Sequence, residues 1–210
     1  METLNYILMA DIIDSSSKDQ KGLMEQFAYI VSGVNKVCKK HILSPLTITL
    51  GDEFQGVAKN LAGAAKLILA LEEKLIAEKA DFKLRYVLLQ GRIETPINKE
   101  LAYGMLGKGL TDARKSLQVM KEKQSRFWFE VKKNGLGDAL NDCFLVYQSL
   151  VDLWKKERHY ELITHFLELK DYKEVAVKTG KTRSQIWKLE KSLKINEYIA
   201  IKNIIHYLSS

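Results

Sequence analysis

The first 135 residues alternate between short apolar runs and segments with helical periodicity. Residues 5–13 form an apolar run that is too short for a core helix, and this run predicts a buried central strand. Similar runs predict further strands at 46–50, 53–58, 82–93 and 126–131. Apolar residues at helical spacing predict helices at about 17–41, 60–79 and 110–123. The predicted order is therefore β-α-β-β-α-β-α-β.

The predicted secondary structure changes near residue 138. After this position the sequence shows only helical patterns and no strand pattern. Phe144, Tyr147, Leu150 and Trp154 lie on one face of an amphipathic helix, and further helical patterns continue to residue 210. We therefore expect an α/β domain at residues 1–138 and a helical C-terminal domain at residues 139–210.

Composition places the chain among ordered globular proteins. Hydrophobic residues make up 46% and charged residues 28%, with only 2 Pro and 12 Gly. The two cysteines, Cys38 and Cys143, lie in apolar helical patterns, which favours free thiols and a reducing cytoplasm. The N-terminus lacks a basic region, and no apolar stretch approaches the ~18 residues that a membrane span needs. We expect a cytoplasmic protein with no membrane partner.

The net charge of +7 favours an acidic partner, and much of the excess lies in one short segment. Three acidic residues between positions 170 and 194, Asp171, Glu174 and Glu190, oppose eight basic ones, which gives a local charge of +5. The basic residues are Lys170, Lys173, Lys178, Lys181, Arg183, Lys188, Lys191 and Lys194.

Two aspartates are predicted to meet at one edge of the sheet. Asp11 lies at the end of the first strand, and Asp52 lies in the hairpin turn between the second and third strands. Neighbouring carboxylates are ligands that Mg²⁺ or Mn²⁺ prefers, with positions left open for phosphate and water. Each aspartate alone has a simpler explanation as a turn or capping residue. Their order and spacing together favour a metal site.

The stretches LMADIIDSS and TLGDEFQGV resemble the two metal-binding motifs of class III nucleotide cyclases, whose fold is related to GGDEF-type synthases and polymerase palms. GDEFQG and the opening ADII-x-SS are more similar still to the SatD family, which joins such a domain to a C-terminal helix-turn-helix. The resemblance covers about residues 4–131. It implies an α+β fold, a ferredoxin-like, palm-type sheet with helices on one face, followed by the all-α module. It also implies metal ligation by Asp11, the Ile12 carbonyl and Asp52, and a homodimer.

A serine cluster follows the first strand. Ser15, Ser16 and Ser17 lead into the first helix, whose free N–H groups and dipole are able to hold a triphosphate. The same serines are also typical of a simple N-cap, so both interpretations stay open.

Several cyclase positions are not matched. The two positions that read the purine fall on Ile48 and Gly104, which lack the necessary side chains. The positions that orient the ribose and stabilise the transition state fall on Thr111 and Lys115, with Arg114 one residue away. The resemblance therefore implies a degenerate nucleotide site, in which Thr111 contacts nucleotide and Lys115 or Arg114 provides the remaining positive charge.

The segment 172–193 fits the steric pattern of a helix-turn-helix. Val175 and Ala176 belong to its first helix, Gly180 suits a left-handed turn, and Ile186 and Leu189 pack the second helix. The residues expected to face DNA are those of the N-terminal half of the second helix: Thr182, Arg183, Ser184, Gln185 and Lys188. The alternative is a helical hairpin for dimer contacts with a solvated basic face.

Together these features favour a cytoplasmic regulator that senses a nucleotide, with Mg²⁺ or Mn²⁺, and binds double-stranded DNA. The alternative is an active nucleotidyl cyclase or nucleotidyltransferase that uses two metal ions. In that case the helical tail would serve assembly.

Overall fold

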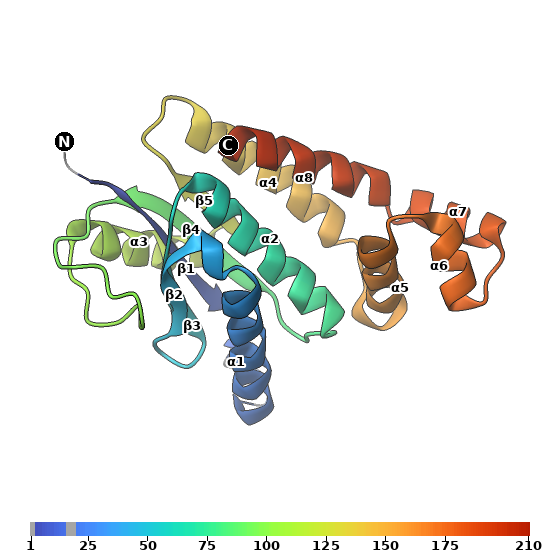
Figure 1. Ribbon diagram of the computed structural model, residues 1–210, viewed down its shortest axis with the longest axis horizontal. Helices are drawn as coiled ribbons and strands as arrows, with labels where there is room; N and C mark the ends of the chain where they lie inside the picture. Colours follow the sequence, from blue (N-terminus) through green and yellow to red (C-terminus); the bar gives the residue numbers. More distant parts are fainter. Residues whose placement is uncertain (1–2, 16–19) are drawn as a thin grey trace.

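The computed structural model describes residues 3–15 and 20–210, and it contains one five-stranded sheet (Figure 1). The strands lie in the order β2-β3-β1-β4-β5. β1 is antiparallel to both of its neighbours, β2 is antiparallel to β3, and β5 is parallel to β4. Their bounds are β1 Asn5–Ile12, β2 Ile42–Ile48, β3 Glu53–Ala58, β4 Leu84–Gly91 and β5 Phe127–Glu130. The predicted central strand is therefore confirmed.

Both faces of the sheet are covered, because successive residues of β1 point to opposite faces and both sets are apolar. Leu8, Ala10 and Ile12 pack against α1 (Gln20–Val37) and α2 (Leu61–Ala77). Ile7 and Met9 belong to a second core with α3 (Lys108–Val119) and the loop before it. The expectation of helices on one face is wrong, because the apolar residues of the second face need a helix of their own.

Local sequence signals set several boundaries. The Asn60 side chain accepts a hydrogen bond from the Gly63 N–H and begins α2, as predicted. Gly91 lies where β4 and α3 approach closely, since a Cβ there would come within 2.7 Å of the Gly109 Cα. Two short 3-10 helices, Lys39–His41 and Met120–Glu122, continue the chain after α1 and α3.

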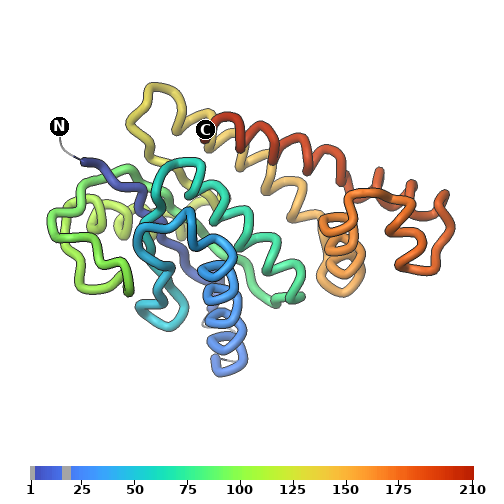
Figure 2. The backbone as a smooth tube through the Cα atoms, in the orientation of Figure 1, coloured from blue at the N-terminus to red at the C-terminus, as the bar shows by residue number. Residues whose placement is uncertain are grey.

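The C-terminal helices pack on the α/β layers at one end and extend away from them at the other. α4 (Leu136–Val151) lies beside β5, and α8 (Ile195–Ser209) runs back along α4 and α2 (Figure 1). Between them, α5 (Lys156–Leu169), α6 (Tyr172–Thr179) and α7 (Arg183–Ser192) form the end of the molecule farthest from the sheet (Figure 2). We call residues 156–192 the arm. No helix among the described residues has both the length and the hydrophobicity for crossing a bilayer.

The hydrophobic core continues across residue 138, where the sequence predicts a domain boundary. Phe127 of β5 contacts Phe144 and Tyr147 of α4, and Tyr147 in turn contacts Tyr198 of α8. One cluster of buried side chains extends from β1 through these aromatic rings to Ile163 and Ile186 in the arm. The arm is therefore built onto the same core as the sheet.

A buried ion pair lies where α2, β4, β5 and α4 meet. Arg126 donates from Nη1 and Nη2 to the two Glu72 carboxylate oxygens at 3.1 and 2.9 Å, and it also donates to the Leu84 carbonyl. Burial lowers the pKa of Arg126, but the adjacent Glu72 carboxylate raises it by a larger amount. The net shift of the pKa is upward, so the guanidinium stays charged. Glu72 also accepts a hydrogen bond from the Tyr86 hydroxyl, and all three side chains are buried.

We predict that Arg126→Met lowers the free energy of unfolding by about 3–5 kcal/mol, because it leaves the Glu72 carboxylate buried without its counter-charge. Urea unfolding followed by circular dichroism measures the change. Lys79→Met is the control, since the Lys79–Glu161 pair is 51% and 72% exposed and its loss should change stability by less than about 1 kcal/mol. Equal losses in the two variants would contradict the central role of the buried pair.

Candidate functional site

Three charged residues form a row across the sheet on the face that α3 covers. In the strand register, Asp11 of β1 pairs with Glu53 of β3 on one side and with Arg85 of β4 on the other. Residues opposite each other on neighbouring strands point to the same face. Two residues away from this row along β1 and β4, on the same face, Met9 and Val87 are apolar and belong to the core under α3. The row therefore lies at the polar edge of that core.

The Asp11 carboxylate is compensated by basic side chains of the protein. Nη1 of Arg85 lies 3.0 Å from both carboxylate oxygens of Asp11, and Nζ of Lys121 lies 3.7 Å from one of them. Burial raises the pKa of Asp11, while Arg85 and Lys121 act in the opposite direction and nearby Asp52 adds to the increase. The Asp11 and Arg85 side chains are only 6% and 11% exposed. Breaking such a pair costs about 3–5 kcal/mol.

The predicted metal ligands are brought together by the end of β1 and the β2–β3 hairpin. The Ile12 N–H donates to the Asp52 carbonyl at 2.9 Å, and the Ser15 hydroxyl donates to the Asp52 carboxylate at 2.6 Å. The predicted phosphate residue Ser15 therefore contacts the hairpin aspartate, whereas Ser16 and Ser17 lie outside the described residues.

The oxygen donors have the right chemistry for Mg²⁺, but in this arrangement they do not fit the ion. Arg85 lies against both oxygens of the most buried carboxylate, where a bidentate cation would lie. Within the described ranges, no group of three or more His, Cys, Asp and Glu side chains is arranged to hold a metal ion. Metal ligation by Asp11, Ile12 and Asp52 stays a prediction from the resemblance.

A groove of about 400 Å³ lies between the sheet and α3, next to the charged row. Thr111, Arg114 and Lys115 line it from α3, and Gln55 lines it from β3. Arg114 donates from Nη2 to the Glu53 carboxylate at 2.6 Å, which ties α3 to the row. Thr111 and Lys115 are exposed. The three predicted positions on α3 are thus collected on one groove.

Sequence reasoning missed Arg85 and Lys121, the two basic partners of Asp11. Arg85 follows from the antiparallel register of β1 and β4, which no local pattern in the sequence reveals. The strand period of two is the signal that could have placed Arg85 on the same face as Val87, two residues later in the predicted strand.

The arm has the helix boundaries that the sequence predicts. Gly180 adopts a left-handed φ of 66° after α6, and Thr182 begins α7 through a capping box with Gln185. Val175, Ala176 and Ile186 are buried, together with Ile163 and Phe166 of α5. The three helices of the arm therefore pack on one another through residues that belong to the main hydrophobic core.

The residues predicted to face DNA all lie on the surface. Thr182, Arg183, Ser184, Gln185 and Lys188 are exposed, as are all eight basic residues between positions 170 and 194. In the part of the chain that the structure describes, none of these eight forms a salt bridge with a carboxylate. Their positive charge therefore remains available to a partner.

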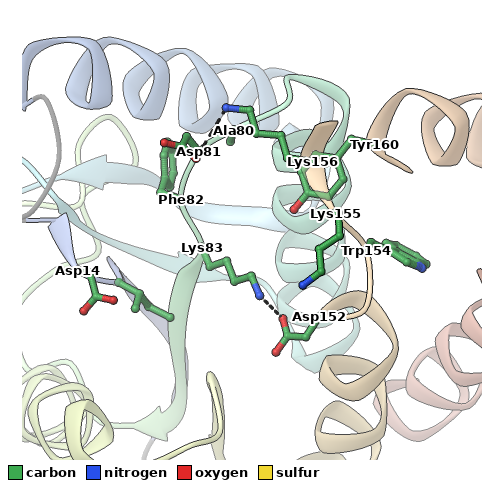
Figure 3. Close-up of a pocket in the computed structure, with 11 residues that line it drawn as sticks. Asp14, Ala80, Asp81, Phe82, Lys83, Asp152, Trp154, Lys155, Lys156 and Tyr160 are labelled. Carbon is green, nitrogen blue, oxygen red and sulfur yellow. Dashed lines mark hydrogen bonds and ion pairs between the residues drawn. The ribbon is translucent and has the colours of Figure 1, made fainter. Parts of the chain in front are cut away.

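A pocket of about 390 Å³ marks the junction between the sheet and the arm (Figure 3). Lys83 before β4 donates to Asp152 after α4 at 2.5 Å, and Lys156 of α5 lies 3.7 Å from Asp81. Three lysines and three aspartates line the pocket, so their formal charges cancel: Asp14, Asp81, Lys83, Asp152, Lys155 and Lys156. We interpret this pocket as a polar contact region between the sheet and the arm.

These features define an α+β protein in which a five-stranded sheet with a charged, groove-bearing face is continuous with a helical arm. Residues 6–208 match the model of the SatD family, so the chain belongs to that family. A search of curated proteins finds no match.

Part of the fold is similar to solved nucleotide cyclases. Two structures of a bacterial light-regulated adenylyl cyclase are each 13% identical over 60% of this chain. They give TM-scores of 0.41 and 0.46, with 75% and 43% of the other chain covered. The catalytic core of a rhodopsin-guanylyl cyclase in complex with ATPαS is 14% identical over 56% of this chain and 72% of its own, with a TM-score of 0.36. At these scores the similarity supports no conclusion about function.

We predict that Thr182→Ala destabilises the arm by about 1 kcal/mol, because the first turn of α7 loses the oxygen that accepts from the Gln185 N–H. Hydrogen exchange of the α7 amides measures the loss. Ser184→Ala is the control at an exposed position two residues later. Unchanged exchange in Thr182→Ala would show that the cap does not hold this helix.

Proposed function

We propose that this protein is a DNA-binding regulator whose α/β domain binds a nucleotide. The observation that carries the proposal is the arm, at the end of the molecule farthest from the sheet (Figure 2). There α7 begins at a capping box and exposes Arg183 and Lys188. A short helix fixed on its neighbours in this way is suited to the major groove.

Charge and geometry support DNA as the partner of the arm. Arg183 and Lys188 are exposed on α7, and Lys173 and Lys178 are exposed on α6. Phosphate contacts by such side chains position a protein on DNA, while residues near the N-terminus of the second helix contact base edges. The Gln185 side-chain carbonyl already accepts from the Thr182 N–H. We therefore assign base contacts first to Arg183, Ser184 and Lys188.

The groove beside α3 supports nucleotide binding. Lys115 provides positive charge at its wall and Thr111 provides a hydroxyl, while the neighbouring Arg114 is paired with Glu53. A volume of about 400 Å³ suits a small ligand. A homodimer, expected from the resemblance, would place two arms on one DNA and stays a prediction.

The second candidate is a nucleotidyl cyclase or nucleotidyltransferase. The contact between the β1 end and the Asp52 hairpin favours it, because two-metal chemistry uses neighbouring carboxylates. The Asp11–Arg85 pair disfavours an enzyme of this kind, because the Arg85 guanidinium already lies against the Asp11 carboxylate.

We predict that the protein binds double-stranded DNA with an affinity that falls steeply as salt increases, because Lys and Arg contacts release condensed counterions. Lys188→Ala and Arg183→Ala should each weaken binding, because each removes a side chain assigned to base contacts. Fluorescence anisotropy with a labelled mixed-sequence duplex measures both. Lys133→Ala, at an exposed lysine between β5 and α4, is the control and should bind like the parent. Equal losses in all three variants would contradict binding through the arm.

We predict that ATP or GTP raises the melting temperature of the protein and that Lys115→Ala weakens this binding about tenfold, or about 1.4 kcal/mol. Isothermal titration with each nucleotide measures the affinity, and Lys133→Ala again serves as the control. Chromatography of the same mixtures with Mn²⁺ detects turnover. A cyclic or transferred product that Asp52→Ala abolishes would support the enzyme instead, and the absence of both binding and turnover would refute the nucleotide site.

A further inference from the structure

We infer that Arg85 takes the place of a divalent cation at Asp11, so that basic side chains of the protein neutralise Asp11 and Glu53 on this face of the sheet. The inference deepens the proposed function, because it makes nucleotide binding in the groove independent of a metal. It also departs from the metal ligation that the resemblance implies.

The position of the guanidinium carries the argument. Nη1 of Arg85 is equidistant, at 3.0 Å, from the two carboxylate oxygens of Asp11. A divalent cation held by both oxygens would lie on the same side at about 2.0–2.6 Å. The two positions overlap, so Asp11 holds either the guanidinium or a chelated metal ion.

The surroundings keep the guanidinium in place. Asp11 and Arg85 face each other across the register of β1 and β4, so the backbone of two central strands fixes both Cα atoms. The Asp11 side chain is 6% exposed, which leaves little surface for another ligand. Lys121 adds a second positive charge 3.7 Å away, and this charge opposes the approach of a cation.

The two neighbouring carboxylates also have partners within the chain, one of them basic and one a hydroxyl. Glu53, on the other side of Asp11, accepts from Arg114 of α3 at 2.6 Å. Asp52 accepts from the Ser15 hydroxyl at 2.6 Å. These three carboxylates therefore each have a partner within the chain, and the exposed Lys115 of the groove is left to meet an anionic ligand.

Direct titration of Mn²⁺ tests the inference, with free Mn²⁺ measured by electron paramagnetic resonance and without nucleotide. The variants are Arg85→Gln, which keeps a polar side chain but removes the charge, and Arg85→Gln combined with Asp11→Asn. We expect no specific Mn²⁺ site in the parent protein, one stoichiometric site in Arg85→Gln, and no specific site in the double variant.

Two results would overturn the inference. One is a stoichiometric Mn²⁺ site in the parent protein that the double variant lacks, and this comparison holds even if Arg85→Gln alone does not fold. The other is a folded Arg85→Gln protein that binds no more Mn²⁺ than the parent. Titration of ATP in EDTA runs beside these measurements. ATP binding that occurs with Mg²⁺ but is lost in EDTA would contradict metal-independent nucleotide binding. No ATP binding under either condition, with the expected Mn²⁺ results, would refute the proposed nucleotide site while leaving the role of Arg85 intact.

Discussion

The buried pair of Glu72 and Arg126 is the interaction on which the arrangement of this molecule depends. Arg126 lies just before β5, donates to α2 through Glu72, and donates to the backbone of β4 at Leu84. Its Nη2 also lies 3.7 Å from Asp152, which pairs with Lys83 at the junction pocket. The same side chains thus join the sheet, the helical layer and the beginning of the arm. Because separating these partners would leave a buried charge unpaired, the contact favours one arrangement of the layers.

Charge compensation within the chain also explains the α3 face. Asp11 and Glu53 would repel each other in a row across the sheet if they were left alone. Arg85 and Arg114 remove that repulsion from opposite sides, one from a strand and one from a helix. The outcome is a stable polar edge beside a groove. In our proposal the groove takes the anionic ligand and the polar edge provides structure.

Local signals in the sequence predicted a large part of the fold. The apolar run of β1, the Asn60 cap, and the sequence from Thr182 to Gln185 each determine a boundary within a few residues, and the structure has all three. The sequence analysis did not predict that α3 covers the second face of the sheet. The pattern of an amphipathic helix shows which side of the helix is buried, but it does not show which face of the sheet that side packs on. The core that continues past residue 138 was missed as well, since α8 returns to α2 from far along the chain. Arg85 was missed because strand register is a long-range property.

The central claim, that the arm meets DNA through α7, is tested most directly by amide chemical-shift mapping of the full chain upon addition of duplex DNA. Our account predicts that the largest changes concentrate at residues 182–188, with smaller ones on α6 and none on the sheet. Changes confined to the α/β layers, or no changes at low salt, would contradict it.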